Sequence, residues 1–164
     1  MIGFFNKGAA MTKKVTGIAK LKGMPDIRIR PLRKITMVGT FFDEEDAITS
    51  LLLEVADNEE SRRNGLMGRD DVPEIYGMLF SGLSGGGYFW MKNCVVPLDV
   101  AFMTDDGLIT KIYSMPVDKD GKKRYEYDDG DTMAIEVQMG FMKKWGIERG
   151  FRLETRKLMG VDNG

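Results

Sequence analysis

The side chains with the greatest capacity for chemistry lie close together, in the twelve residues from 88 to 99. Lys92 can hold an anionic group, and Asn93 can orient that group through the hydrogen bonds of its amide. Asp99 carries a carboxylate of the kind that accepts a proton or binds a metal ion. Together these residue types predict a small-ligand or metal site, with hydrolysis as one reaction open to it.

Trp90 and Arg69 complete the set of candidate binding residues. Trp90 belongs to an aromatic run, residues 88–90, on a predicted strand. One face of that strand belongs to the core, and the other either lines a pocket or packs against a helix. Arg69 has a planar guanidinium, which is suited to a paired carboxylate.

The same residues also fit a purely structural role. Asn shapes turns and Asp caps backbone N–H groups so often that this is the simpler interpretation of Asn93 and Asp99. We therefore keep Asp99 and Lys92 as catalytic candidates without assigning a reaction to them. We expect a protein that is not an enzyme.

Three carboxylates fall among the apolar residues of predicted strands: Glu54, Asp99 and Glu136. A buried carboxylate needs a partner, and if the three converge they can bind Mg²⁺ or Ca²⁺. The alternative is an ion pair, for which the candidates are Arg62, Arg69 and Lys92. Because arginine is well suited to buried pairs, we expect ion pairing and no metal site.

The lack of histidine and the single cysteine exclude several kinds of active site. Histidine is absent and cysteine occurs once, at Cys94. A Ser-His-Asp triad, a Cys-His pair and zinc sites that need imidazole or several thiolates are therefore excluded, as is an internal disulfide. With no histidine to activate it, Cys94 is expected to be a small side chain at the edge of the core. We predict no cofactor.

Charge divides the chain into a basic arm and an acidic body. Residues 1–40 carry nine Lys or Arg and one acidic residue, whereas the other 124 residues carry fifteen basic and twenty-four acidic groups. Such an arm suits contact with nucleic acid or with an acidic protein surface. Its candidate contact residues are Lys13, Lys14, Arg28, Arg30, Arg33 and Lys34.

Short alternating segments predict an α+β fold that is mainly β, in one compact domain with most strand pairs antiparallel. The expected strands cover residues 36–42, 47–55, 76–80, 88–92, 97–103, 108–115, 132–138 and 152–155. One short helix is expected after Asp57 or Asn58, ended by Gly65 or Gly68, and a second over residues 141–145.

The remaining segments of the chain are expected to be less regular. Residues 116–131 are dense in both charges and predict a polar loop. The division into domains is a basic extended arm over residues 1–40, a body over residues 41–158 and a frayed tail over residues 159–164.

Several short motifs follow one another along the chain in a characteristic order. They are Leu53 to Asp57, Gly65 to Arg69, Gly77 to Phe80, Phe89 to Asn93, Pro97 to Phe102, Ala134 to Val137, Gly140-Phe141, Gly146-Ile147 and Gly150. In this order and spacing, roughly residues 50–155 resemble the family called domain of unknown function 192. The resemblance implies a small β-rich domain and no particular activity, and it leaves the basic arm unmatched.

These observations lead to three functional hypotheses. The first is a non-enzymatic structural protein whose arm docks on protein subunits of a larger assembly, such as a virion, by strand addition. The second is a ligand or metal site at Lys92, Asn93 and Asp99. The third is contact between the arm and nucleic acid. With no signal peptide and no apolar run long enough to cross a membrane, we expect a cytoplasmic protein or a component of a particle assembled there.

Overall fold

The computed structural model describes residues 35–158. These residues belong to one compact unit of the chain, Arg33–Gly164. Residues 1–34 and 159–164 lie outside the described residues. These segments include most of the basic arm, all six of its candidate contact residues and the expected tail.

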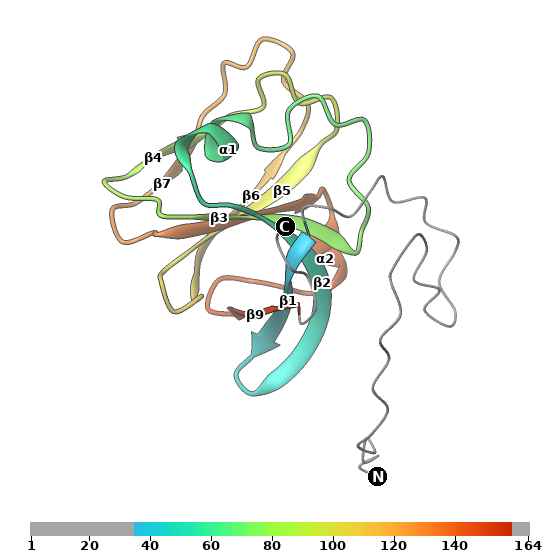
Figure 1. The fold of residues 1–164 in the computed structure, drawn as a ribbon, viewed down its shortest axis with the longest axis vertical. Coiled ribbons are helices and arrows are strands. Elements are labelled where there is room, and N and C mark those ends of the chain that lie inside the picture. Colours follow the sequence, from blue (N-terminus) through green and yellow to red (C-terminus); the bar gives the residue numbers. More distant parts are fainter. Residues whose placement is uncertain (1–34, 159–164) are drawn as a thin grey trace. The chain divides into compact units, whose positions relative to one another are not determined.

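Nine strands and two short helices make up the described part of the chain (Figure 1). The strands are β1 (Ile35–Asp43), β2 (Asp46–Ala56), β3 (Tyr76–Ser81), β4 (Gly87–Phe89), β5 (Leu98–Met103), β6 (Ile109–Met115), β7 (Tyr125–Tyr127), β8 (Met133–Gln138) and β9 (Arg152–Lys157). The helices are α1 (Glu59–Asn64) and α2 (Phe141–Lys144). The domain is therefore mainly β, as the sequence predicts.

Seven strands form one sheet in the order β6-β5-β8-β3-β2-β1-β9. All neighbours are antiparallel except β2 and β3, which run parallel. The two edge strands also meet, because Leu108 forms a bridge with Arg152. Beside that bridge the Ile109 N–H donates to the Phe151 carbonyl at 2.8 Å, and the Leu153 N–H donates to the Gly107 carbonyl at 2.9 Å. This short seam closes the sheet on itself.

The inner face of the closed sheet holds the main core. Buried apolar residues from β1, β2, β3, β5, β8 and β9 meet there, among them Phe41, Leu53 and Ile135. From α2, Phe141 and Met142 join the same cluster, and the Phe41 and Phe141 rings lie 6.0 Å apart. Packing of these apolar side chains, rather than the propensity of a four-residue helix, holds α2 in place.

A second apolar layer covers the outer face. In the strand register, Glu54, Met78, Glu136 and Val100 lie opposite one another across β2, β3, β8 and β5. Side chains alternate between the two faces of a strand, so this row points away from the main core. The small sheet of β4 and β7 lies at the same end of the molecule as α1, whereas the β1–β2 hairpin reaches the opposite end (Figure 1).

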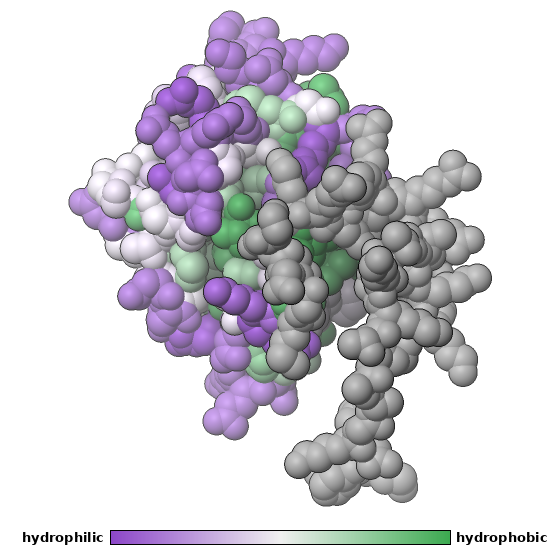
Figure 2. Space-filling view, in the orientation of Figure 1, coloured by the Kyte–Doolittle hydropathy of each residue, from purple (hydrophilic) through white to green (hydrophobic). Residues whose placement is uncertain are grey.

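The surface in the view of Figure 2 is mostly hydrophilic. Polar residues cover the outer parts of this face, and apolar residues show near its middle. This distribution is typical of a domain whose charged residues are on strand edges and loops. No helix among residues 35–158 is long and apolar enough to span a membrane.

The strands and helices follow the predicted pattern, with three differences. Strand β7 lies inside the stretch predicted as a polar loop, because Tyr125 and Tyr127 alternate with Glu126 and pair with β4. Strand β4 ends at Phe89, so Trp90 and Lys92 lie beyond it. Strand β1 begins at Ile35, so residues 35–40, which the charge pattern assigns to the arm, are part of the sheet.

Candidate functional site

A cavity of about 370 Å³ opens on the outer face of the sheet. Its walls come from α1 and the turn after it, from β3 and β8, from the loop containing Leu83, from the segment 88–94 and from β7. Five of the lining side chains are aromatic: Phe80, Tyr88, Phe89, Trp90 and Tyr127. A cavity of this size and character is suited to a small organic molecule.

Local sequence signals place α1 at the rim of this cavity. The Asn58 side chain accepts from the Ser61 N–H at 2.9 Å, and the Asn58 N–H donates to the Ser61 hydroxyl at 3.2 Å. This capping box begins the helix at a defined residue. Gly65 ends it with φ +46°, a conformation that favours glycine.

Gly65 also brings the end of α1 close to the floor of the cavity. A Cβ atom at this position would lie 3.4 Å from the tip of the Phe80 ring and 3.7 Å from Glu136 Oε2. The turn after α1 therefore covers an aromatic ring and a carboxyl oxygen together. A side chain at residue 65 would narrow the space between them.

Glu136 is the buried acid at this cavity. It is 5% exposed, and its Oε2 atom has no hydrogen-bond partner among the described residues. Burial raises the pKa of the Glu136 carboxyl from 4.5 to about 8, because the charged form is poorly solvated there. Tyr125 and Thr132 also carry a buried hydroxyl that has no partner within residues 35–158, but neither residue lines the cavity.

The aromatic wall continues from the floor toward the mouth. The Phe80 and Phe89 rings meet edge to face with centroids 4.9 Å apart, and Phe89 lies 6.2 Å from Tyr127. Such contacts fix the rings relative to one another. Tyr127 was missed in the sequence because its strand was predicted as a loop; the alternation of Tyr125, Glu126 and Tyr127 is the signal that reveals it.

Charged side chains of α1 line the outer rim. Arg62 donates to the Ser81 carbonyl at 2.9 Å, and Arg63 pairs with Glu59 at 2.7 Å. Arg63 and Glu59 are largely exposed, so water and salt screen them. These groups surround the mouth, while Glu136 is the acid in its interior.

Cys94 lines the same cavity and is 8% exposed. Burial, with a smaller effect from the nearby Glu136 carboxylate, raises the pKa of the Cys94 thiol from 9.0 to about 11. A thiol with a raised pKa is a poor nucleophile. Its place in the lining means that the reaction of the Cys94 thiol with an added reagent depends on access to the cavity, and its raised pKa does not favour a role as a nucleophile.

The predicted binding residues Trp90, Lys92 and Asn93 lie at or beyond the mouth. Trp90 is half-buried, and both Lys92 Nζ and the Arg124 guanidinium lie over its ring, at 5.0 and 4.8 Å from the centroid. Asn93 is exposed with φ +59°, and its carbonyl accepts from the Gly68 N–H at 2.9 Å. Its backbone shapes the turn.

Asp99 lies on the inner face of the sheet, apart from these residues. In the register it stands opposite Val137 of the main core, and it is 1% exposed. Its carboxylate accepts from the Ser114 hydroxyl at 2.7 Å, the Gly140 N–H at 2.8 Å and the Met142 N–H at 3.2 Å. The structure therefore does not unite Asp99 with Lys92 and Asn93; the carboxylate holds the first turn of α2.

Arg69 pairs with Glu54, the other carboxylate of the outer row. Arg69 Nη2 lies 2.7 Å from Glu54 Oε2, and the Tyr76 hydroxyl donates to the same oxygen at 2.8 Å. The Arg69 guanidinium also lies 5.3 Å from the Tyr76 ring centroid. Burial and the hydrogen bond to Glu54 raise the pKa of Tyr76. Glu54 thus has the arginine partner that the sequence predicts for a buried carboxylate.

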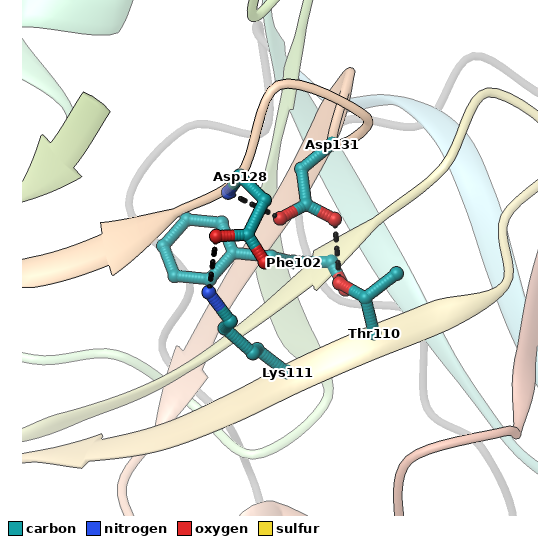
Figure 3. Close-up of polar contacts among 5 residues, drawn as sticks. All are labelled: Phe102, Thr110, Lys111, Asp128 and Asp131. Atoms are coloured by element: carbon teal, nitrogen blue, oxygen red, sulfur yellow. Dashed lines mark hydrogen bonds and ion pairs between the residues drawn. The ribbon is translucent and has the colours of Figure 1, made fainter. Parts of the chain in front are cut away.

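A further buried carboxylate, Asp131, has a structural role (Figure 3). It is 1% exposed; the Thr110 hydroxyl lies 2.5 Å from one oxygen, and the Asp128 N–H donates to the other at 2.9 Å. The same Thr110 hydroxyl lies 3.1 Å from the Phe102 carbonyl, and Lys111 pairs with Asp128 at 2.8 Å. These contacts tie the segment after β7 to β5 and β6.

The three carboxylates considered together in the sequence do not converge. Glu54 and Glu136 lie on the outer face with Met78 between them in the register, and Asp99 lies on the inner face. Among residues 35–158, no group of three or more Cys, Asp or Glu side chains is arranged to hold a metal ion.

Fold and site together define a small β domain with a closed sheet and an aromatic cavity on its outer face. The chain belongs to the family DUF192, the domain of unknown function described as an uncharacterized ACR, which matches residues 41–155. This membership confirms the resemblance carried by the sequence motifs. Among curated proteins there is no match.

Two solved structures have a similar fold. A Sinorhizobium meliloti 1021 protein, proposed to be a transcription regulator, is 28% identical with a TM-score of 0.66, over 73% of this chain and 92% of its own. A protein of unknown function from Novosphingobium aromaticivorans is 20% identical with a TM-score of 0.65, over 77% of this chain and 98% of its own.

Proposed function

We propose that the domain binds a small organic molecule in the cavity bounded by α1, the outer face of the sheet and residues 88–94. The observation that carries this proposal is the buried Glu136 carboxyl, whose Oε2 has no partner among the described residues at a cavity walled by aromatic rings. A buried polar atom without a partner costs free energy, and a ligand that bonds to it offsets that cost.

The composition of the cavity supports the same proposal. Apolar and aromatic walls provide binding energy, and one or two polar groups orient the ligand. Apart from Glu136, the lining contains no buried carboxylate and no histidine, and burial raises the pKa of its one thiol, Cys94. Binding without chemistry is therefore the function that this geometry supports best.

The natural thiol of Cys94 provides a test on the whole chain. Indole or 2-phenylethanol in the cavity is expected to slow the reaction of Cys94 with dithiodipyridine, in proportion to occupancy. Because the chain has one cysteine, the measured rate reports on this site alone. An unchanged rate at the solubility limit of both compounds would contradict the proposal.

A variant that fills the cavity is the matched control. Leu83 is 8% exposed and lines the cavity, so Leu83→Trp places an indole where a ligand would lie. Protection by added indole is expected to disappear in this variant, and also in guanidinium-unfolded protein. Equal protection in the folded variant and the native protein would show that the compounds act elsewhere.

The basic arm supports two further proposals, docking on a larger assembly in the cytoplasm and contact with nucleic acid. The strong charge asymmetry of the chain supports both. That the Sinorhizobium meliloti protein is proposed to be a transcription regulator adds support for nucleic acid. Binding of the arm to nucleic acid would weaken steeply with added salt, whereas binding in the aromatic cavity would not.

A further inference from the structure

We propose that the ligand of this cavity is an organic cation, an ammonium group attached to a flat or apolar body, whose charge meets Glu136 while the aromatic rings surround its body. This inference rests on the proposed small-molecule binding and names its ligand class. It follows from the placement of one acid and several rings around the same space.

The floor of the cavity brings the acid and the rings together. The tip of the Phe80 ring and Glu136 Oε2 both lie within 4 Å of a single point beside Gly65. The faces of aromatic rings attract cations, and a carboxylate supplies the opposite charge. An ammonium group that enters the cavity beside Glu136 would give its Oε2 atom a hydrogen-bond donor, and the aromatic rings of the lining would surround the apolar body.

The rings at the mouth already hold cations. The Arg124 guanidinium lies 4.8 Å from the centroids of both Tyr88 and Trp90, and Lys92 Nζ lies 5.0 Å from that of Trp90. In contrast, no cation lies over the rings of Phe80, Phe89 or Tyr127 among the described residues. The described part of the chain thus places its own cations over the rings at the mouth and leaves the inner rings, which pack against one another, without one.

The two arginines of α1 repel a ligand cation in the cavity only weakly. Arg63 is paired with Glu59, and Arg62 is held by the Ser81 carbonyl on the rim. Water screens charges on the rim, whereas the buried Glu136 is screened far less. The attraction between a cation in the cavity and the ionised Glu136 carboxylate is thus stronger than the repulsion between that cation and the arginines.

Titration of Glu136 predicts how affinity depends on pH. Because its pKa is about 8, the carboxyl is mostly protonated at about pH 7 and mostly ionised at about pH 9. Alkyl ammonium groups, like lysine, keep their proton over this range. Tyr76 and Cys94 interact with the Glu136 carboxyl. The other titratable or charged residues that line the cavity are Tyr88, Tyr127, Arg62, Arg63 and Glu59. The Cys94 thiol, with its pKa of about 11, stays neutral, and arginine stays charged.

Isothermal titration of the full chain with phenethylammonium and with neutral 2-phenylethanol tests the inference. The two probes share an aromatic body and differ in the charged nitrogen. At about pH 9 we expect phenethylammonium to bind about tenfold more tightly than 2-phenylethanol. Its affinity should fall on going to about pH 7, while that of 2-phenylethanol stays unchanged.

The variant Glu136→Gln removes the charge and keeps the shape. It is expected to lose the preference for phenethylammonium, so that the two probes bind to the variant with similar affinity. Equal affinity of the native chain for the two probes overturns the cation inference but leaves the proposed binding function intact. Affinity for both probes that falls as pH rises also overturns it, because that result means that neutral Glu136 donates a hydrogen bond to the ligand. Failure of both probes to bind would contradict the binding function itself.

Discussion

Three buried carboxylates of similar sequence context have different roles because their partners differ. Glu54 is bonded to Arg69 and Tyr76, so it holds the segment after α1 against the sheet. Asp99 is bonded to backbone N–H groups and organises α2. Glu136 has one oxygen without a partner among the described residues, and it lies at the cavity. At the scale of single residues, the hydrogen-bond partners of a buried carboxylate therefore distinguish the acids with a structural role from the acid that we propose for binding.

The role of Asp99 leads to a stability prediction. Asp99→Ala leaves the N–H groups of Gly140 and Met142 without their acceptor, so we expect a loss of about 3 kcal/mol in the free energy of unfolding. Asp99→Asn keeps one acceptor oxygen for those groups and should cost about 1 kcal/mol. Urea denaturation of the three proteins measures both losses. If Asp99→Ala unfolds at the native midpoint, the carboxylate does not hold α2.

At the scale of elements, the seam between β6 and β9 decides whether the sheet is open or closed. Gly107 has φ +84°, and its carbonyl accepts from the Leu153 N–H across the seam. Arg152 reinforces the contact, because its Nη1 lies 2.6 Å from both the Asp106 carbonyl and Asp106 Oδ2. The turn after β5 therefore does two things: it reverses the chain and it docks on the last strand.

The close approach at Gly107 predicts a severe effect of a single methyl group. A Cβ atom there would overlap the Leu153 carbonyl oxygen, so Gly107→Ala must open the seam or shift β9. We expect a loss of about 3 kcal/mol or more. Gly68→Ala is the control, because Gly68 also has positive φ but nothing lies within 4 Å of the added atom. It should cost only about 1 kcal/mol by thermal or urea unfolding; similar losses in both variants would mean that the seam contact contributes little.

At the scale of the whole molecule, the two faces of one sheet have different roles. The inner face packs the main core and is closed by α2, whereas the outer face carries a second apolar layer with a cavity in it. The basic arm forms a third part by its charge, and its candidate contacts lie outside residues 35–158.

Removal of residues 1–34 separates the arm from the cavity. If the arm docks on an assembly, the truncated chain should stay folded, bind 2-phenylethanol like the full chain, and no longer join that assembly. Circular dichroism, titration and co-sedimentation with the purified assembly measure the three properties. Undiminished co-sedimentation would contradict docking by the arm, and a loss of folding would show that the arm belongs to the domain.

The sequence by itself determines the local elements of this protein. The sequence places the start of α1 at Asp57 or Asn58 and its end at Gly65 or Gly68, and the structure has Asn58 and Gly65 there. The turn residues Asp105, Asp106 and Gly107 lie between β5 and β6, and such signals act over a few neighbouring residues. The order and spacing of the short motifs were enough to identify the family. Alternation of apolar residues was enough to place most strands.

Only the tertiary structure decides which of these residues act together. Asp99 stands six residues from Asn93 in the chain, yet its carboxylate holds α2 on the inner face of the sheet. Glu136 and Phe80 are far apart in the chain, yet strand pairing and the Gly65 turn bring them to one point. The burial of a side chain and its hydrogen-bond partners depend on contacts between distant segments of the chain. The sequence therefore shows which acids and aromatic rings are present, and the fold determines which acid lies at the cavity.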